Sequence, residues 1–139
     1  QYGVELYKAG HHGSKTSSSM ELLNVIKPRV VCVCCCAGSS EYTSKPENQF
    51  PTKQFINNIS SFTTEVYVTT MCIDYKNNEF TSFNGNIVVM SNVEETKVNV
   101  YCSNNRTKLK DTDWFKNNRL KICKQQDGEN AVFDASWYS

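Results

Sequence analysis

The chain has 139 residues, of which 39% are hydrophobic, so it has the size of one ordinary domain and can bury a core. Its 15 basic and 14 acidic side chains leave a formal net charge of +1. This balance excludes a protein that binds polyelectrolytes with its whole surface. No hydrophobic run approaches the roughly 20 residues that span a bilayer, so we expect no membrane segment.

The first third of the sequence predicts a strand, a helix and a second strand. Hydrophobic and polar residues alternate over Tyr2–Ala9, which is typical of a half-buried strand. Ser18 and Glu21 have the spacing of a capping box, and Lys27-Pro28 ends the short helix that follows. The continuous apolar run Arg29–Ala37 predicts a strand buried on both faces. The helix residues that we expect to face the core are Leu22, Leu23, Val25 and Ile26.

A second helix and strand follow a polar loop. The loop Gly38–Phe50 is long for a plain connection, which is typical of functional or mobile loops. Pro51 suits the first turn of a helix, whose apolar side would carry Phe55, Ile56 and Ile59. Residues Glu65–Thr70 then predict a strand with Val66 and Val68 on one face.

The remainder of the chain is typical of β structure. Segments Glu79–Phe83 and Asn86–Ser91 flank Asn84-Gly85, a pair that favours a two-residue hairpin turn. Lys97–Cys102 predicts another strand, and Asp111–Arg119 a helical turn. We expect the last aromatic side chains to dock back onto the domain; these are Phe133, Trp137 and Tyr138.

Four of the seven cysteines lie within one apolar run. On a strand, Cys32, Cys34 and Cys36 share one face and Cys35 takes the other. They are compatible with a soft-metal site, a thiol enzyme or buried thiols that pack a central strand. Strand neighbours surround an ion poorly and a strand interior does not activate a thiol, so we favour buried thiols. The odd number of cysteines favours a reduced, cytoplasmic setting, with secretion left open.

One segment carries most of the chemistry, Gly10-His11-His12-Gly13-Ser14-Lys15, and it contains the only two histidines of the chain. It follows a predicted strand end, where α/β folds present functional loops. Neutral imidazole binds Zn, Mn or Fe, so His11 or His12 is a candidate metal ligand. From the residues alone, surface or structural histidines explain the pattern equally well.

The stretch from Leu6 to Ser19, followed by Leu22-Leu23 and Ile26-Lys27-Pro28, resembles the metallo-β-lactamase-fold hydrolases. The resemblance is closest to the branch that includes the hydrolase domain of the ComEC/Rec2 competence proteins. That pattern is an apolar strand, HHGSxxSS, a short helix ending in KP, and a strand that closes on a small-residue turn, here Ala37-Gly38. The resemblance covers roughly residues 2–91.

The resemblance implies an α/β fold, an αββα sandwich that binds one or two Zn or Mn ions at one edge, and only in the complete domain. The family's main metal motif, HxHxDH, does not occur here, since the chain has no third histidine. Residues 1–92 would then be the C-terminal half of such a domain, with a mixed sheet and short helices, and residues 93–139 a β-strand and helix extension packed on it. The implied partner is the missing N-terminal half. Otherwise the tail from Val93, or self-association, must cover the exposed sheet face.

The same resemblance implies roles for individual residues. His11, His12 and Ser14 would be catalytic, with either histidine as the metal ligand. Lys15 and Lys45 would contact the substrate, Lys45 standing beside a proline where competence-type relatives carry Tyr-Gly-His-Pro. The alternative for Lys45 is an ordinary solvated surface lysine, which is where most lysines lie. The substrate would be a phosphodiester such as single-stranded DNA. Basic and aromatic tail residues would either grip it or form an ordinary solvated face; they are Arg106, Lys108, Lys110, Trp114, Lys116, Arg119, Lys121 and Lys124.

Two functions from different classes remain after this reading. In the first, the chain is part of a metal-dependent hydrolase of the metallo-β-lactamase superfamily and is inactive without the main metal motif. In the second, it is a non-catalytic binding module that retains the fold. The absent ligands and the altered segment from Tyr42 to Pro46 favour the second.

Overall fold

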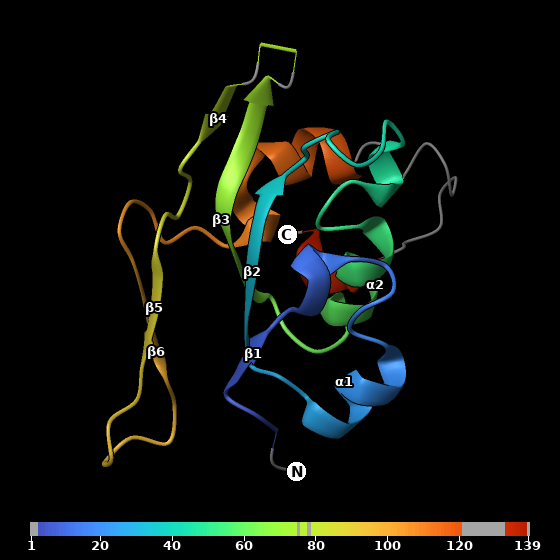
Figure 1. Ribbon diagram of the computed structural model, residues 1–139. Coiled ribbons are helices and arrows are strands. Elements are labelled where there is room, and N and C mark those ends of the chain that lie inside the picture. The colour runs from blue at the N-terminus through green and yellow to red at the C-terminus, as the bar shows by residue number, and fades with distance from the viewer. Residues whose placement is uncertain (1–2, 75, 78, 121–132, 139) are drawn as a thin grey trace.

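The structure, a computed structural model, describes residues 3–74, 76–77, 79–120 and 133–138 (Figure 1). It is a mixed α/β fold around a four-stranded sheet with the strand order β1-β2-β3-β4. The first three strands are parallel and β4 is antiparallel to β3. The strands are β1 (Leu6–Lys8), β2 (Val30–Ala37), β3 (Glu65–Asp74) and β4 (Glu79–Thr81). The predicted α/β class with a mixed sheet and few helices is confirmed, whereas β1 is shorter than the strand expected at the N-terminus.

Two helices connect the parallel strands and cover one face of the sheet (Figure 1). Helix α1 (Met20–Ile26) begins at Ser19, whose hydroxyl accepts from the amide of Leu22, so the cap lies one residue later than predicted. Helix α2 (Lys53–Ser60) begins at Thr52, whose hydroxyl accepts from the amide of Phe55. Pro51 therefore precedes the cap of α2 and does not lie in its first turn.

The core beneath these helices uses one face of β2 and β3. Val31 pairs with Val66 and Val33 with Val68, and all four side chains are buried. The predicted core face of α1 is half wrong, because Leu22 is 42% and Val25 78% exposed. A helix of seven residues turns only one narrow stripe inward, which here carries Leu23 and the half-buried Ile26.

A two-stranded antiparallel ribbon covers the opposite face of the sheet (Figure 1). It consists of β5 (Ile87–Met90) and β6 (Asn99–Cys102). Val100 of the ribbon packs with Val30, Cys32 and Tyr67 of the sheet in a second apolar cluster. The face that we expected to be exposed in half a sandwich is therefore partly covered by the tail after Val93.

The hairpin predicted at Asn84-Gly85 is wrong. Strand β4 pairs with β3, and β5 pairs with β6, so the Asn84-Gly85 pair leads the chain from the sheet to the ribbon. Asn84 is fully buried, and its amide nitrogen donates to the carbonyls of Val68 (2.9 Å) and Thr107 (3.1 Å). Its side-chain oxygen accepts from the amide of Thr107 at 3.0 Å. These three bonds make Asn84 a tertiary cross-link between segments far apart in the chain.

Short helical turns in the C-terminal part complete the core. They are η3 (Leu109–Asp111), the π-helical turn η4 (Phe115–Leu120) and η5 (Ala135–Trp137), and the earlier loops hold η1 (Gly10–Gly13) and η2 (Pro46–Asn48). The rings of Phe115 and Trp137 meet edge to face at 5.3 Å, and Phe133 lies 5.7 Å from Phe115. The expected docking of the terminal aromatic residues is confirmed, and Phe133 and Trp137 belong to the core itself. No helix in the described ranges is long and apolar enough to cross a membrane.

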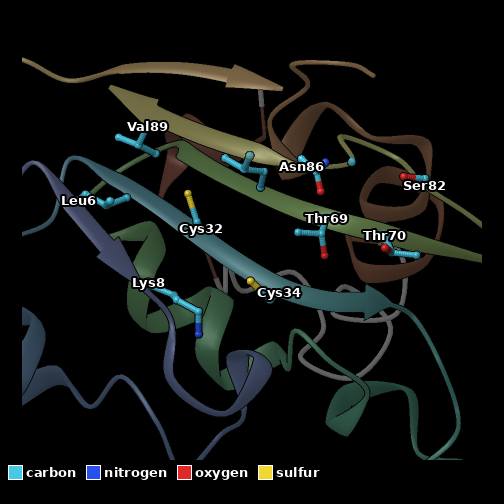
Figure 2. A pocket seen from close by; sticks show the side chains of 11 residues that line it. Leu6, Lys8, Cys32, Cys34, Thr69, Thr70, Ser82, Asn86 and Val89 are labelled. Atoms are coloured by element: carbon cyan, nitrogen blue, oxygen red, sulfur yellow. The ribbon is translucent and has the colours of Figure 1, made fainter. Parts of the chain in front are cut away.

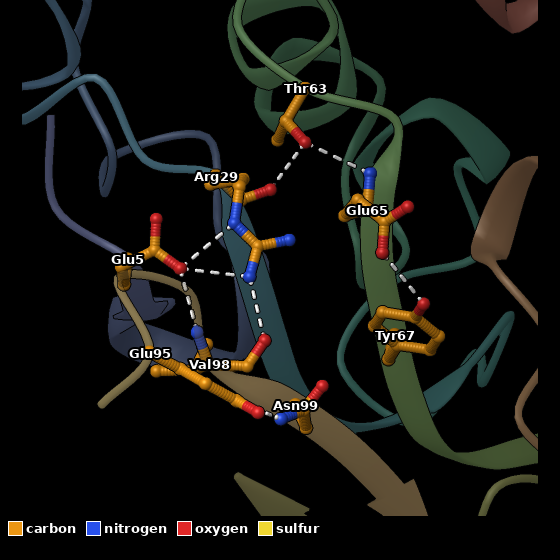
Figure 3. Close-up of polar contacts among 8 residues, drawn as sticks. All are labelled: Glu5, Arg29, Thr63, Glu65, Tyr67, Glu95, Val98 and Asn99. Carbon is orange, nitrogen blue, oxygen red and sulfur yellow. Dashed lines mark hydrogen bonds and ion pairs between the residues drawn. The ribbon is translucent and has the colours of Figure 1, made fainter. Parts of the chain in front are cut away.

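A polar network ties the ribbon to the start of the sheet (Figure 3). The carboxylate of Glu5 accepts from the guanidinium of Arg29 at 2.9 Å and from the amide of Val98 at 2.8 Å, and Arg29 also donates to the carbonyl of Val98. Glu65 on the neighbouring strand pairs with Lys108 at 2.7 Å. The contacts of Glu5 and Arg29 with Val98 hold the start of β6 beside β1 and β2.

The network makes the stability of the fold depend on pH. The Arg29 hydrogen bond lowers the pKa of Glu5 below its ordinary value of 4.5. Burial raises the pKa of Glu65, but bonds from Lys108 and Tyr67 outweigh it, so the net shift is also downward. A carboxyl group whose pKa is lowered by folding stabilises the folded state at any pH above its unfolded-state pKa. That contribution is lost as the pH falls through the folded-state pKa.

We therefore expect the wild type to unfold at a higher temperature than a Glu5→Gln variant. The difference between the two midpoints should be constant from neutral pH to about pH 5 and should shrink at lower pH. Thermal unfolding of both proteins, followed by circular dichroism between about pH 3 and pH 7, measures this difference. A difference between the two midpoints that stays constant down to about pH 3 would contradict the assignment.

Candidate functional site

The histidine loop is a tight turn at the carboxyl end of β1. His11 and His12 have φ angles of 43° and 56°, in the left-handed region that side chains other than glycine seldom adopt. Gly13 follows with φ of 76°, and a Cβ there would lie 2.9 Å from the Cβ of Pro51. The amide of Thr52 donates to the carbonyl of Gly13 at 2.9 Å. The loop is thus held in an unusual conformation against the start of α2.

A hydrogen bond to the backbone of β2 orients the His12 imidazole. Its Nδ1 lies 2.5 Å from the backbone carbonyl of Cys34 on β2. Because a carbonyl only accepts, the imidazole proton must be on Nδ1. In the neutral ring Nε2 then carries the lone pair, and the side chain is exposed. His11 has no such bond to a described residue, so the structure distinguishes the two histidines where the sequence did not.

Phe50 closes one side of the histidine pair. Its ring centroid lies 5.7 Å from that of His11 and 6.0 Å from that of His12, while the two imidazoles are 6.2 Å apart. Tyr42 from the same loop lies 5.7 Å from Phe50. From the sequence we expected Lys45, beside Pro46, to contribute to the site, and Phe50 was not identified. The available signal was an aromatic residue directly before Pro51 at the start of a predicted helix.

A cleft of about 220 Å³ opens beside His12. Its lining includes donor atoms from Cys34, Cys36 and Glu41, together with Ser39, Tyr42 and Phe50. Within the described ranges, no group of three or more His, Cys, Asp or Glu side chains is arranged to hold a metal ion. The cleft therefore presents one oriented imidazole beside further donors that do not converge on one point.

The cysteine run is interrupted by an irregularity in the pairing of β2 with β3 between Val33 and Cys36. The side chain of Cys34 is exposed, so the prediction of buried thiols is wrong for it, although it holds for Cys32. Burial raises the pKa of Cys32 and of Cys36 to about 11 each. Burial also raises the pKa of Cys35, which packs against the main core. Neutral, packed thiols of this kind are poor nucleophiles.

The other predicted site residues do not line the His12 cleft. Ser14 is buried, and its hydroxyl is 2.9 Å from that of Thr16, so it stabilises the loop from inside. Lys15 lines a separate groove of about 460 Å³ with Glu47. Lys45 is exposed and lines neither that groove nor the His12 cleft. Of the predicted site residues, only His12 lines this cleft, and its ring lies 6.2 Å from that of His11.

A larger groove lies between the sheet and the ribbon (Figure 2). Its volume is about 590 Å³, and Cys34 lines both this groove and the His12 cleft. The floor comes from β1, β2 and β3, and the opposite wall from residues around β5. Its polar lining residues are Lys8, Thr69, Thr70, Ser82 and Asn86. Lys8 and several hydroxyl and amide groups therefore line a groove that shares Cys34 with the His12 cleft.

The basic residues between positions 106 and 124 do not form one continuous binding surface among the described residues. Arg119 is buried, Lys108 is paired with Glu65, and Lys110 is paired with Asp111 at 2.8 Å. Lys121 and Lys124 lie outside the described residues. Among the described positions, this arrangement favours the interpretation of an ordinary surface.

Comparisons of the chain with protein-family models, with curated proteins and with solved structures found no match to any of them.

Proposed function

We propose that this chain forms part of a metal-dependent hydrolase, as the C-terminal half of a metallo-β-lactamase-like αββα sandwich, with His12 as a metal ligand. One observation carries the proposal, the 2.5 Å contact between His12 Nδ1 and the carbonyl of Cys34. Metal-binding histidines commonly donate their second ring nitrogen to a carbonyl or carboxylate, which orients the ring and leaves the other nitrogen for the ion. His12 has this arrangement at the end of a parallel strand.

The residues of the His12 cleft fit one corner of an ion site. His12 Nε2 would be the ligand from this chain, and Glu41 lines the same cleft. The chain has only two histidines, so further ligands would come from polypeptide outside this sequence. A bound Zn or Mn ion would lower the pKa of a water molecule and polarise the scissile group.

The groove between sheet and ribbon suggests the substrate class. Lys8 supplies a cation, and Thr69 and Asn86 are among the hydrogen-bonding groups that line the space up to Cys34. A phosphate-bearing chain such as a phosphodiester matches this lining, because its oxygens accept from ammonium, hydroxyl and amide donors. In this proposal Lys8, and not Lys45, is the lysine that contacts the substrate phosphate.

The proposal is tested by titrating this chain with Mn²⁺ and with Zn²⁺ and following the imidazole resonances by nuclear magnetic resonance. We expect Mn²⁺ to broaden the His12 ring signals first. A His12→Ala variant should bind at least about 10-fold more weakly, since losing even the outer partner of a metal ligand costs about that much. The matched control is His11→Ala, which should retain binding. Equal losses in the two variants would contradict the assignment of His12.

A second function, a non-catalytic binding module, is favoured by the contact of Phe50 with both imidazoles. An apolar ring against two exposed histidines resembles a recognition surface as much as an ion site. The same titration separates the two functions. If neither Mn²⁺ nor Zn²⁺ perturbs His12, the assignment of His12 as a metal ligand fails, and the binding module becomes the better-supported function.

A further inference from the structure

Arg119 is a buried cation in the C-terminal part of the chain, only 2% exposed. Its guanidinium donates to three backbone carbonyls of one loop: Pro46 at 2.8 Å, Gln49 at 3.0 Å and Pro51 at 2.8 Å. The guanidinium carbon of Arg119 lies over the Trp114 ring, 5.1 Å from the ring centroid. A charge buried to this extent is costly unless such contacts compensate for the lost water. The arrangement therefore fixes the loop strongly in place.

The three carbonyls surround the residue that contacts the histidines. Gln49 and Pro51 are the immediate neighbours of Phe50, so Arg119 holds the backbone on both sides of that ring. The carbonyl of Phe50 itself accepts from the amide of Gly38 at 2.9 Å. Trp114 packs directly on Gly38, where an added Cβ would lie 2.3 Å from the indole nitrogen. The C-terminal part thus clamps the loop from two directions.

The clamped loop in turn contacts the histidine turn. Pro51 packs against Gly13, and the bond from the Thr52 amide to the Gly13 carbonyl joins the two backbones. The contacts therefore form a continuous chain from Arg119 through Phe50 and Pro51 to the turn that carries His11 and His12. Every step in this chain is a direct contact.

We propose that Arg119 is a positioning residue of the histidine site: through three backbone carbonyls it holds the Phe50 ring against His11 and His12. Lysine cannot replace it fully, because only the planar guanidinium fork reaches several carbonyls at once. This inference depends on the proposed function only for what His12 does once it is positioned. The positioning itself is measured without any metal ion, so the two proposals can fail separately.

The test uses Arg119→Lys and Arg119→Gln with Phe50→Ala as the reference for a removed ring. In the wild type, the ring current of Phe50 shifts the His11 and His12 ring-proton resonances. We expect both Arg119 variants to lose most of that shift and to move towards the positions seen in Phe50→Ala, the glutamine variant further than the lysine variant. Adding Arg119→Lys to Phe50→Ala should change the imidazole resonances no further.

The matched control is Arg106→Lys, which alters an exposed arginine and should leave the imidazole spectrum unchanged. Cooperative unfolding by circular dichroism establishes which variants are folded. A folded Arg119 variant with wild-type imidazole resonances would overturn the proposal. If neither Arg119 variant folds, the residue serves the fold as a whole, which overturns its specific role at the histidines as well.

Discussion

Replacing Trp137 with alanine is expected to lower the free energy of unfolding by about 3–5 kcal/mol, the range typical of large aromatic residues in a core. Trp137 is 1% exposed, packs edge to face on Phe115 and donates from Nε1 to the carbonyl of Thr63 at 3.1 Å. Removing the ring leaves a cavity between α2 and the C-terminal turns and an unpaired carbonyl. Denaturant unfolding followed by circular dichroism measures the loss.

Trp137→Phe separates packing from hydrogen bonding. This variant keeps most of the ring volume but loses the Nε1 donor, so we expect a smaller loss of about 1–2 kcal/mol. Similar stabilities for wild type and Trp137→Ala would show that the terminal aromatic residues do not belong to the core. The described contacts of Phe133 with Trp137 would then have to be wrong as well.

Replacing Asn84 with alanine should cost about 3 kcal/mol, although the residue lies between strands and outside any regular element. Three hydrogen bonds to the backbone of Val68 and Thr107 disappear together, and the buried carbonyl of Val68 loses this donor. The loss also weakens the join between the sheet and the ribbon. Chemical denaturation measures the unfolding free energy, and exchange of the Thr107 amide proton reports the local effect.

Asn24→Ala is the matched control, since Asn24 is an exposed residue of α1. Its replacement should change stability by no more than about 0.5 kcal/mol. An Asn84→Asp variant should be at least as damaging as Asn84→Ala, because it loses the Nδ2 donor and buries a charge. A cost below about 1 kcal/mol for Asn84→Ala would mean that the ribbon does not depend on this residue.

The C-terminal region supports the histidine site, although it lies far from His11 and His12 in the sequence. Residues after 93 contribute Val100 to one face of the sheet and Leu109, Phe115 and Trp137 to the core on the other. Arg119 then connects that core to the loop that carries Phe50. Changes in the C-terminal part are therefore expected to reach the histidines through packing and hydrogen bonds.

Local elements were predictable where they depend on near neighbours. Ser19 and Thr52 cap helices within two residues of the predicted starts, and Lys27-Pro28 ends α1 as expected. The Asn84-Gly85 turn was predicted wrongly, because the same dipeptide favours a hairpin only when the flanking strands pair with each other. Here β4 pairs with β3 and β5 pairs with β6, so the two flanking strands do not pair with each other. Leu22 and Val25 show the same limit, since hydrophobicity alone does not say which face of a short helix is covered.

Periodicity and residues close along the chain were enough to predict the order of strands and helices, the glycine-flanked histidine turn at a strand end, and the presence of a core. Long-range packing, by contrast, sets which histidine is oriented, which aromatic ring contacts it and which cation holds that ring. His12 meets a carbonyl 22 residues away, and Arg119 meets one 68 residues away. Contacts of this kind follow from how whole elements pack, and no local pattern encodes them.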